Sequence, residues 1–255
     1  MSGAWARLGR DRLAALSALM LAALAAVALL APVLAALLGV DPNAVDLLER
    51  FGPPSAKHWL GTDEIGRDVL LRLILGGQVS LFVGLVAALA SAVIGTVVGL
   101  IAGYRGGALD DALMRLTDGV IALPLLPLLI VMAALDLSKL GISPEAAGSP
   151  AASFWRIVAI IALVGWTTVA RLVRGATLSV RTQDFVAAAV SQGTPPWRIM
   201  LVHILPNVAS PIVVATTLSV GNVILLESVL SFLGLGIQPP VPSWGNMRTN
   251  AQELV

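Results

Sequence analysis

The sequence predicts an all-α polytopic membrane protein, and two observations support this class. Of the 255 residues, 57% are hydrophobic and only 12% are charged, whereas soluble domains carry a charge at about 25% of their positions. The apolar residues also form long runs, and a helix needs about 20 such residues to cross a bilayer. A soluble globular enzyme is therefore excluded. The net charge of +1 indicates no basic face for nucleic acid, and the absence of cysteine excludes thiolate chemistry and disulfides.

We expect five membrane helices in a single transmembrane domain, residues 13–255, after a cytoplasmic N-terminus at residues 1–12. The five apolar segments are residues 13–38, 79–102, 120–135, 153–172 and 208–235. The first is too long for a signal-peptide core of about 7–15 residues, so we expect it to remain as a helix. The third spans only if its helix begins near Leu109, and Pro124 and Pro127 should bend it.

The charges around the first apolar segment predict its orientation. Three arginines precede it within residues 1–12, and Asp41 and Asp46 follow it. Because Lys and Arg beside membrane helices favour the cytoplasmic side, we expect the N-terminus inside. With five helices, four positions then mark the two sides, namely Arg181 and Trp197 in the cytoplasm and Trp59 and Trp244 outside.

A stripe of small residues marks the second apolar segment. Gly95, Gly99 and Gly103 are spaced four apart, and small residues at this spacing let two helix backbones pack closely in a bilayer. The spacing predicts a helix-packing face. The helix that it meets belongs either to this chain or to a partner subunit.

The segment 173–207 is the longest polar stretch on the predicted cytoplasmic side. Its first part is typical of a short helix, with Thr182 as N-cap and Asp184 in the first turn, where a negative charge suits the helix dipole. Three small side chains follow on this helix, namely Ala187, Ala188 and Ala189.

A second short helix should follow the first in this segment. Gly193 permits a sharp turn, and Thr194 is expected to cap a helix that has Pro195 at its first position. The pair exposes a small, smooth surface that fits a groove on another protein. Alternatively, the segment lies along the membrane interface with Trp197 as an anchor.

Several motifs together resemble those of ABC importer permeases. Residues 185–189 (Phe-Val-Ala-Ala-Ala), Gly193 and residues 203–207 (His-Ile-Leu-Pro-Asn) are similar in order and spacing to the coupling signature of that family. Further motifs resemble the second-type permease subunit of the dipeptide/oligopeptide/nickel group, and they lie at residues 58–68, 102–107, 165–166, 170–175, 227–228, 231–240 and 242–246. The matches extend over about residues 10–250.

The resemblance implies a type I ABC importer permease fold, with a sixth membrane helix that we expect beyond Val255. It also implies that segment 173–207 couples the chain to an ATPase through six residues: Asp184, Ala187, Ala188, Ala189, Gly193 and Arg198. The family usually has glutamate where this chain has Ala187. Docking should therefore rely more on shape and on Arg198.

The resemblance implies partners in the bacterial inner membrane: a homologous second permease, two cytoplasmic ATPases and an extracytoplasmic solute-binding protein. ATP and Mg would bind to the ATPases, because this sequence has no Gly-x-x-x-x-Gly-Lys-Ser/Thr phosphate loop. The chain itself is expected to be a non-enzymatic translocation subunit without a cofactor. Dipeptides or oligopeptides are the expected cargo. A nickel-chelate importer, or a secondary transporter or membrane scaffold, is the alternative.

Glu227 is the one ionisable residue deep in the last apolar segment, and Asn222 precedes it by five positions. A carboxylate at membrane depth is costly unless it is protonated, paired or facing water. We expect both residues to contribute to the translocation path or its gate. An interhelical hydrogen bond is the alternative role for Glu227.

His58 together with Asp63 and Asp68 raises the question of a metal site. One histidine with carboxylates is a poor ligand set for nickel-class ions. Thr62 is expected to cap a helix with Asp63 in its first turn, and Arg67 can pair with Asp63 four residues earlier. We therefore expect no metal site and no catalytic residue.

Overall fold

The computed structural model describes residues 11–39, 41–135, 141 and 143–249. This part of the chain is helical, and its extended pairing is confined to an isolated bridge between Thr62 and Asp68. Within it, four helices are long and apolar enough to cross a membrane, and a bent pair of helices would make a fifth span. The predicted all-α polytopic membrane class is confirmed.

Contacts divide the chain into two compact units, residues 1–81 with 239–255, and residues 82–238. In the first unit, the helices are α2 (Arg12–Leu29), α3 (Ala31–Leu38), the short η1 (Leu47–Glu49), the start of α4 (Val69–Arg105) and α12 (Asn246–Thr249). The predicted segment 13–38 is therefore two helices, which separate at Leu30. Pro32 lies in the first turn of α3, where its missing N–H is tolerated.

Helix α4 begins at Val69, earlier than the predicted start at residue 79. Its first turn carries Arg72, which is only 4% exposed and lies within hydrogen-bond distance of Asn43 Oδ1 (3.3 Å) and the Pro240 carbonyl (3.5 Å). Helix α4 can include the charged Arg72 because polar partners inside the first unit accommodate its guanidinium group. The helix therefore begins before the uncharged stretch of the sequence.

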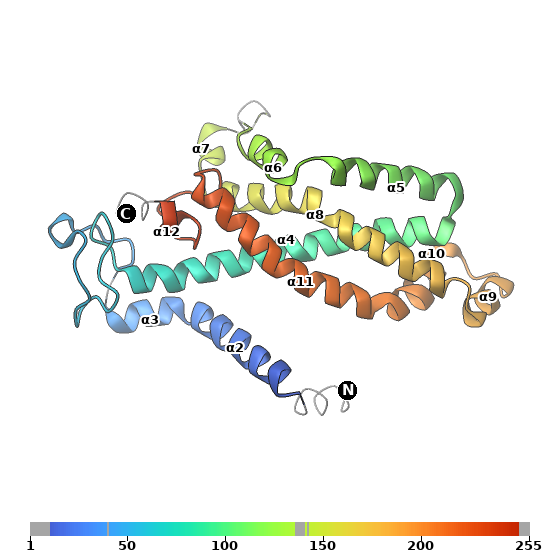
Figure 1. Cartoon of the computed structure of the whole chain (residues 1–255), viewed down its shortest axis with the longest axis horizontal. Helices are drawn as coiled ribbons and strands as arrows, with labels where there is room; N and C mark the ends of the chain where they lie inside the picture. The colour runs from blue at the N-terminus through green and yellow to red at the C-terminus, as the bar shows by residue number, and fades with distance from the viewer. Residues whose placement is uncertain (1–10, 40, 136–140, 142, 250–255) are drawn as a thin grey trace. The chain divides into compact units, whose positions relative to one another are not determined.

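In the second unit, α8 is the central helix, and it contacts α5, α6 and α11 (Figure 1). The helices of this unit after α4 are α5 (Gly107–Ala122), α6 (Leu125–Ala133), α7 (Pro144–Ala147), α8 (Pro150–Val180), α9 (Asp184–Ser191), α10 (Pro196–Arg198), the π-helix η3 (Ile199–Ile204) and α11 (Leu205–Phe232). The predicted segments 153–172 and 208–235 correspond to α8 and α11.

The predicted bend in the third segment is confirmed. Helices α5 and α6 meet at 85°, and the break lies at Leu123 and Pro124, whose backbones are extended. Pro124 acts as N-cap of α6, whereas Pro127 lies within α6 without breaking it. Helix α6 ends at Ala133, two residues before the predicted end of the segment at residue 135.

The glycine stripe lies against α8 of the same chain. A Cβ on Gly95 would be 2.5 Å from the Trp166 carbonyl, and one on Gly99 would be 2.6 Å from the Ala170 carbonyl. At Gly103 the nearest atom would be Thr177 Cβ at 2.7 Å. Since real Cβ atoms do not approach so closely, the two backbones can be this near only because all three positions are glycine.

Candidate functional site

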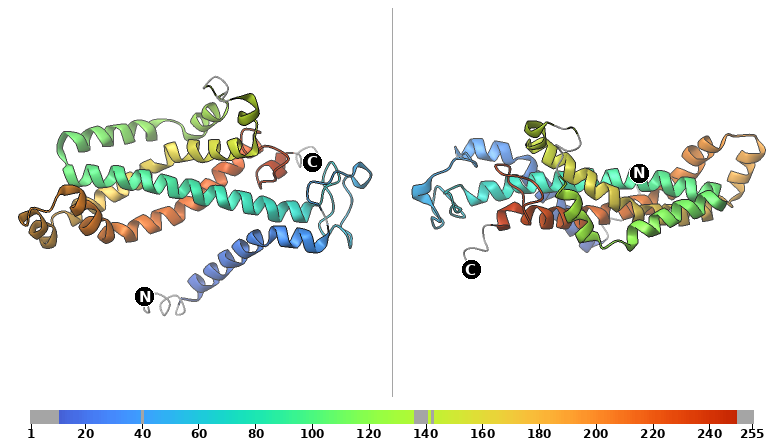
Figure 2. Two further views of the ribbon diagram at one scale, coloured as in Figure 1. Left: turned by 180° about the vertical axis from the view of Figure 1, so that it is seen from behind. Right: turned by 90° about the horizontal axis from the view of Figure 1, so that it is seen from above.

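Helices α9 and α10 lie together at the end of the second unit where α8 ends and α11 begins, as the views in Figures 1 and 2 agree. Asp184 is in the first turn of α9, as predicted. The predicted N-cap, Thr182, is wrong. Gln183 occupies that position, and the Thr182 hydroxyl donates instead to the Ser179 carbonyl (2.9 Å) at the end of α8.

One face of α9 packs on the membrane helices of the second unit. Val186 is 2% exposed and Ala189 is 5% exposed. Both belong to an apolar cluster shared with Val173 of α8, Ile199 of η3 and Val208 of α11. The position of α9 is therefore tied to the ends of α8 and α11.

The opposite face of α9 is exposed. Ala187 and Ala188 are both exposed, and Phe185 beside them is 42% exposed. The three predicted contact alanines thus divide into an exposed pair and a buried Ala189. The expectation that Ala189 contributes to an outer contact surface needs correction, because its side chain packs inside the chain.

A tight turn closes α9. Gly193 has φ +74°, a left-handed conformation that favours glycine. Its N–H donates to the Val190 carbonyl (2.9 Å), and the Thr194 N–H donates to the Ala189 carbonyl (3.1 Å). This pair of bonds is the Schellman motif, which satisfies the last carbonyls of a helix. The sharp turn predicted at Gly193 is present.

The next helical segment begins one residue later than predicted. Pro195 is the N-cap of α10, and Pro196 occupies the first helical turn, so the prediction of Thr194 as cap is wrong. Trp197 is 61% exposed and Arg198 is also exposed. Here α10 continues into the π-helix η3, a rare geometry that often occurs at functional sites.

Two arginines of α8 and Arg181, the C-cap of that helix, tie the helices together beside this segment. Arg174 makes two bonds to Asp110 of α5, from Nε to Oδ1 (2.5 Å) and from Nη2 to Oδ2 (2.6 Å). Arg171 pairs with Asp118 of α5, and Arg181 donates to the Gly103 carbonyl of α4 (2.9 Å). The sequence alone marked Arg181 as cytoplasmic and placed Arg171 and Arg174 in a family motif, but it did not predict these pairs. The signal available in the sequence for these ion pairs was the presence of two aspartates, Asp110 and Asp118, on the earlier helix α5.

Asn222 lies on the exposed side of α11 and lines a cavity of about 270 Å³ within the second unit. Glu227 is 0% exposed and is not among the described residues that line this cavity. Its Oε1 accepts a hydrogen bond from the Ser231 hydroxyl (2.6 Å), which in turn accepts the Ile237 N–H (3.0 Å). The structure therefore places the two predicted path residues in different surroundings.

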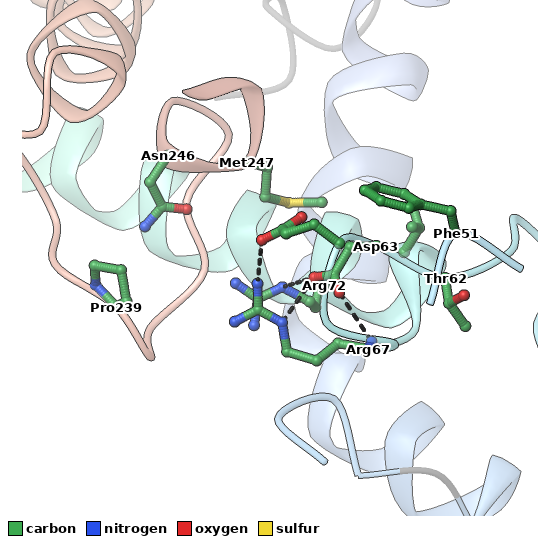
Figure 3. Close-up of a pocket in the computed structure, with 10 residues that line it drawn as sticks. Phe51, Thr62, Asp63, Arg67, Arg72, Pro239, Asn246 and Met247 are labelled. Carbon is green, nitrogen blue, oxygen red and sulfur yellow. Dashed lines mark hydrogen bonds and ion pairs between the residues drawn. The ribbon is translucent and has the colours of Figure 1, made fainter. Parts of the chain in front are cut away.

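The loop before α4 in the first unit holds a network of charges around a cavity of about 220 Å³ (Figure 3). Arg67 Nε bonds Asp63 Oδ2 (2.7 Å), as predicted, and Arg67 Nη2 bonds Glu64 (3.1 Å). Thr62 does not cap a helix, because its hydroxyl donates to the Glu49 carbonyl. Asp68 caps α4 instead, accepting the Leu71 N–H (2.7 Å).

His58 lies in the same loop between two carboxylates. Its Nδ1 is 2.8 Å from Asp68 Oδ2, and its Nε2 is 2.9 Å from Glu49 Oε2. Asp63 bonds Arg67 and not His58, so the three residues considered as metal ligands do not converge on one point. Across the described ranges, no group of three or more His, Asp or Glu residues is placed to hold a metal ion.

Comparisons with known proteins all point to membrane components of transport systems. A family model described as "Binding-protein-dependent transport system inner membrane component" matches residues 95–255. The dipeptide transport system permease protein DppC of Bacillus subtilis is 39% identical over 96% of this chain and 71% of the relative. The oligopeptide transport system permease protein OppC of the same species is 33% identical over 82% of this chain and 64% of the relative.

A third relative is the probable D,D-dipeptide transport system permease protein DdpC of Escherichia coli. It is 36% identical over 84% of this chain and 67% of the relative. The chain therefore spans about two thirds of the length of the curated relatives that it matches.

Proposed function

The chain belongs to the family of binding-protein-dependent transport system inner membrane components, and we propose that it is one permease half of an ATP-driven importer of short peptides. The names of its relatives, which are dipeptide and oligopeptide permeases, support this cargo. The working complex would contain a homologous second permease, two cytoplasmic ATPases that hold ATP and Mg, and an extracytoplasmic solute-binding protein. The N-terminus would lie in the cytoplasm.

In this proposal α9 is the element that meets an ATPase. The observation that carries it is the division of α9 into two faces, with Ala187 and Ala188 exposed and Val186 and Ala189 buried. A small exposed face fits a cleft on another protein. Because the buried face shares a core with α8 and α11, a displacement of α9 would be passed on to these helices through that core.

The remaining coupling residues surround this contact. Asp184 would meet the ATPase from the first turn of α9, and Gly193 would let the chain leave the cleft sharply. Arg198 is exposed, and docking would rely more on it because Ala187 lacks the carboxylate that the family usually has at that position. All three are proposed contacts.

Asn222 would face the transported molecule, and Glu227 would belong to the gate. Asn222 lines a cavity of the second unit, which supports contact with cargo. Glu227 holds Ser231 at the end of α11, so its gate role would be to fix the end of that helix.

The test is ATP-dependent uptake by the complete complex in proteoliposomes. The chain would be co-expressed with its neighbouring permease, ATPase and binding-protein genes, and uptake of labelled alanyl-alanine measured with and without ATP. We expect uptake that requires both ATP and the binding protein. Import of a nickel chelate but not of the dipeptide would overturn the proposed cargo, and transport without any ATPase would overturn the proposed class.

A further inference from the structure

The cavity beside Asn222 combines an apolar wall with neutral polar groups from three helices. Its polar lining residues lie on α4, α8 and α11, and they are Ser91, Thr167, Thr168, Ser219 and Asn222. The described lining holds no charged side chain. The lining part of α8 is near the middle of that helix. If α8 spans the bilayer, the cavity lies deep within it.

Among the polar residues that line the cavity, Ser91 is distinguished by the state of its hydroxyl group. It is 2% exposed, and its Oγ has no hydrogen-bond partner within the described part of the chain. Buried hydroxyls are nearly always hydrogen-bonded. By contrast, Thr167 donates to the Val164 carbonyl (3.1 Å) and Ser219 donates to the Ala215 carbonyl (2.8 Å). Ser91 therefore offers a donor that a bound molecule can use.

The break between α5 and α6 borders the same cavity. Leu123 and Leu125, on either side of Pro124, both line it. Helix α6 starts without a side-chain cap, and the first N–H groups of a helix lack partners within that helix. At membrane depth such backbone is tolerated where it lines a cavity or is buried in protein. The break between the two helices thus lies at the border of the cavity that Ser91 also lines.

We propose that this cavity binds the backbone of the transported peptide, with Ser91 and Asn222 as hydrogen-bonding residues. The inference rests on the proposed function and names a cargo subsite for it. Neutral donors and acceptors match the amide and carbonyl groups of a peptide bond. They do not match its charged termini, which would lose hydration without gaining an opposite charge.

The apolar wall suits the side chains of such a cargo. Leu123, Leu125 and Leu129 face the cavity together with Ile161 and Val164. These residues can contact an apolar side chain without specific bonds. A site of this kind recognises the peptide bond and accepts varied side chains.

The first test removes the free hydroxyl. Ser91→Ala keeps the packing but deletes the donor, and we expect about fivefold to tenfold slower alanyl-alanine uptake by the complete complex, the effect of losing one hydrogen bond. Thr168→Val should act in the same direction. Thr217→Val is the matched control, since Thr217 is exposed on α11 and is not among the lining residues. Assembled yield should stay at the parental level in all three variants, and uptake and basal ATP hydrolysis should both stay parental in Thr217→Val.

The second test locates the cargo directly. An alanyl-photoleucine dipeptide would be cross-linked in the same complex during ATP-driven uptake, and the modified residues mapped by mass spectrometry. We expect adducts within residues 120–129 or 219–226, lost in the presence of excess alanyl-alanine. Labelling that excess dipeptide does not reduce would indicate a lipid-like occupant and would overturn the proposal.

Different results would overturn the proposed function and the proposed subsite. Absence of dipeptide uptake by the parental complex would overturn the proposed function and this subsite with it. Parental uptake by Ser91→Ala and Thr168→Val, with adducts confined to other segments, would overturn the subsite alone and leave peptide import standing.

Discussion

The glycine stripe of α4 and the alanine run of α9 are both sets of small residues, yet they meet different neighbours. Gly95, Gly99 and Gly103 lie against the backbone of α8, within distances that no Cβ tolerates. Ala187 and Ala188 are exposed. One set closes a contact inside the chain, and the other leaves a surface open.

The difference shows that small size alone does not define a role. On α4 the small residues are four apart, so they line one side of a long helix and let a second helix approach. On α9 they are consecutive, so they point in different directions, and only Ala189 turns inward. Substitutions that add bulk should therefore separate folding from partner binding.

Gly99→Leu should have the largest effect. Its side chain would collide with the Ala170 carbonyl and Val173 of α8, and overpacking of this kind costs about 3 kcal/mol, at the upper end of the usual range. We expect loss of folded protein, measured as the monodisperse yield after detergent extraction. Gly119→Leu is the control, since a Cβ at Gly119 meets no atom within 4 Å. Equal yields of the two variants would contradict the close α4–α8 contact.

Ala189→Arg should disturb α9 without unfolding the membrane helices. Its charge would enter the cluster that holds Val186 and Ile199, at a local cost of about 3 kcal/mol for an unpaired buried charge. Limited proteolysis should then cleave residues 184–198 much faster than in the parent. A parental cleavage rate would show that Ala189 does not pack inward.

Ala188→Arg tests the open side of the comparison. The side chain is exposed, so we expect parental stability and parental proteolysis but loss of the ATPase subunits on co-purification. A bulky charge at the centre of an interface typically costs about 2 kcal/mol or more of binding free energy. Retention of the ATPase at the parental ratio would refute the proposed docking face. Ser179→Arg, an exposed position at the end of α8, controls for added charge.

Glu227 is a polar side chain that is buried within the second unit, and its substitutions test what a buried polar group contributes. Glu227→Leu removes the acceptor for Ser231 within α11 and should destabilise the assembled complex by about 1–2 kcal/mol, the scale of leaving a buried hydroxyl without its hydrogen bond. Glu227→Gln keeps an oxygen acceptor, so its assembled yield should match the parent. Uptake distinguishes the roles, because normal transport by the Gln variant would contradict a gate role that depends on the carboxylate.

Gly193→Ala should have the smallest effect. The residue adopts φ +74°, but a Cβ there meets no atom within 4 Å, so the penalty is conformational and about 1 kcal/mol. We expect a small loss of ATPase association with parental yield. Gly193→Asn should lose less, since Asn visits this conformation more readily. A larger loss for Asn than for Ala would point to direct contact at this position.

The features of the site that depend on a local rule were predictable from the sequence. The turn at Gly193 follows from a glycine after a short helix, and the bend at Pro124 follows from a missing N–H. Asp184 occupies the first turn of α9 as the helix dipole favours. Caps were predicted less well, because Thr182 and Thr62 bond carbonyls of neighbouring segments and so do not accept from a helix start.

The sequence by itself determined the membrane class, most of the helical spans, the family and the two short helices within residues 173–207, since these depend on composition, periodicity and residue order along the chain. Only the tertiary structure decided that α8 covers the glycine stripe, that Ala189 turns inward, and that Ser91 borders a cavity with Asn222. Each of these outcomes depends on which helices lie side by side. Gly99 and Ala170 lie 71 positions apart, and the spacing of the glycines predicts a packing face but not the helix that covers it.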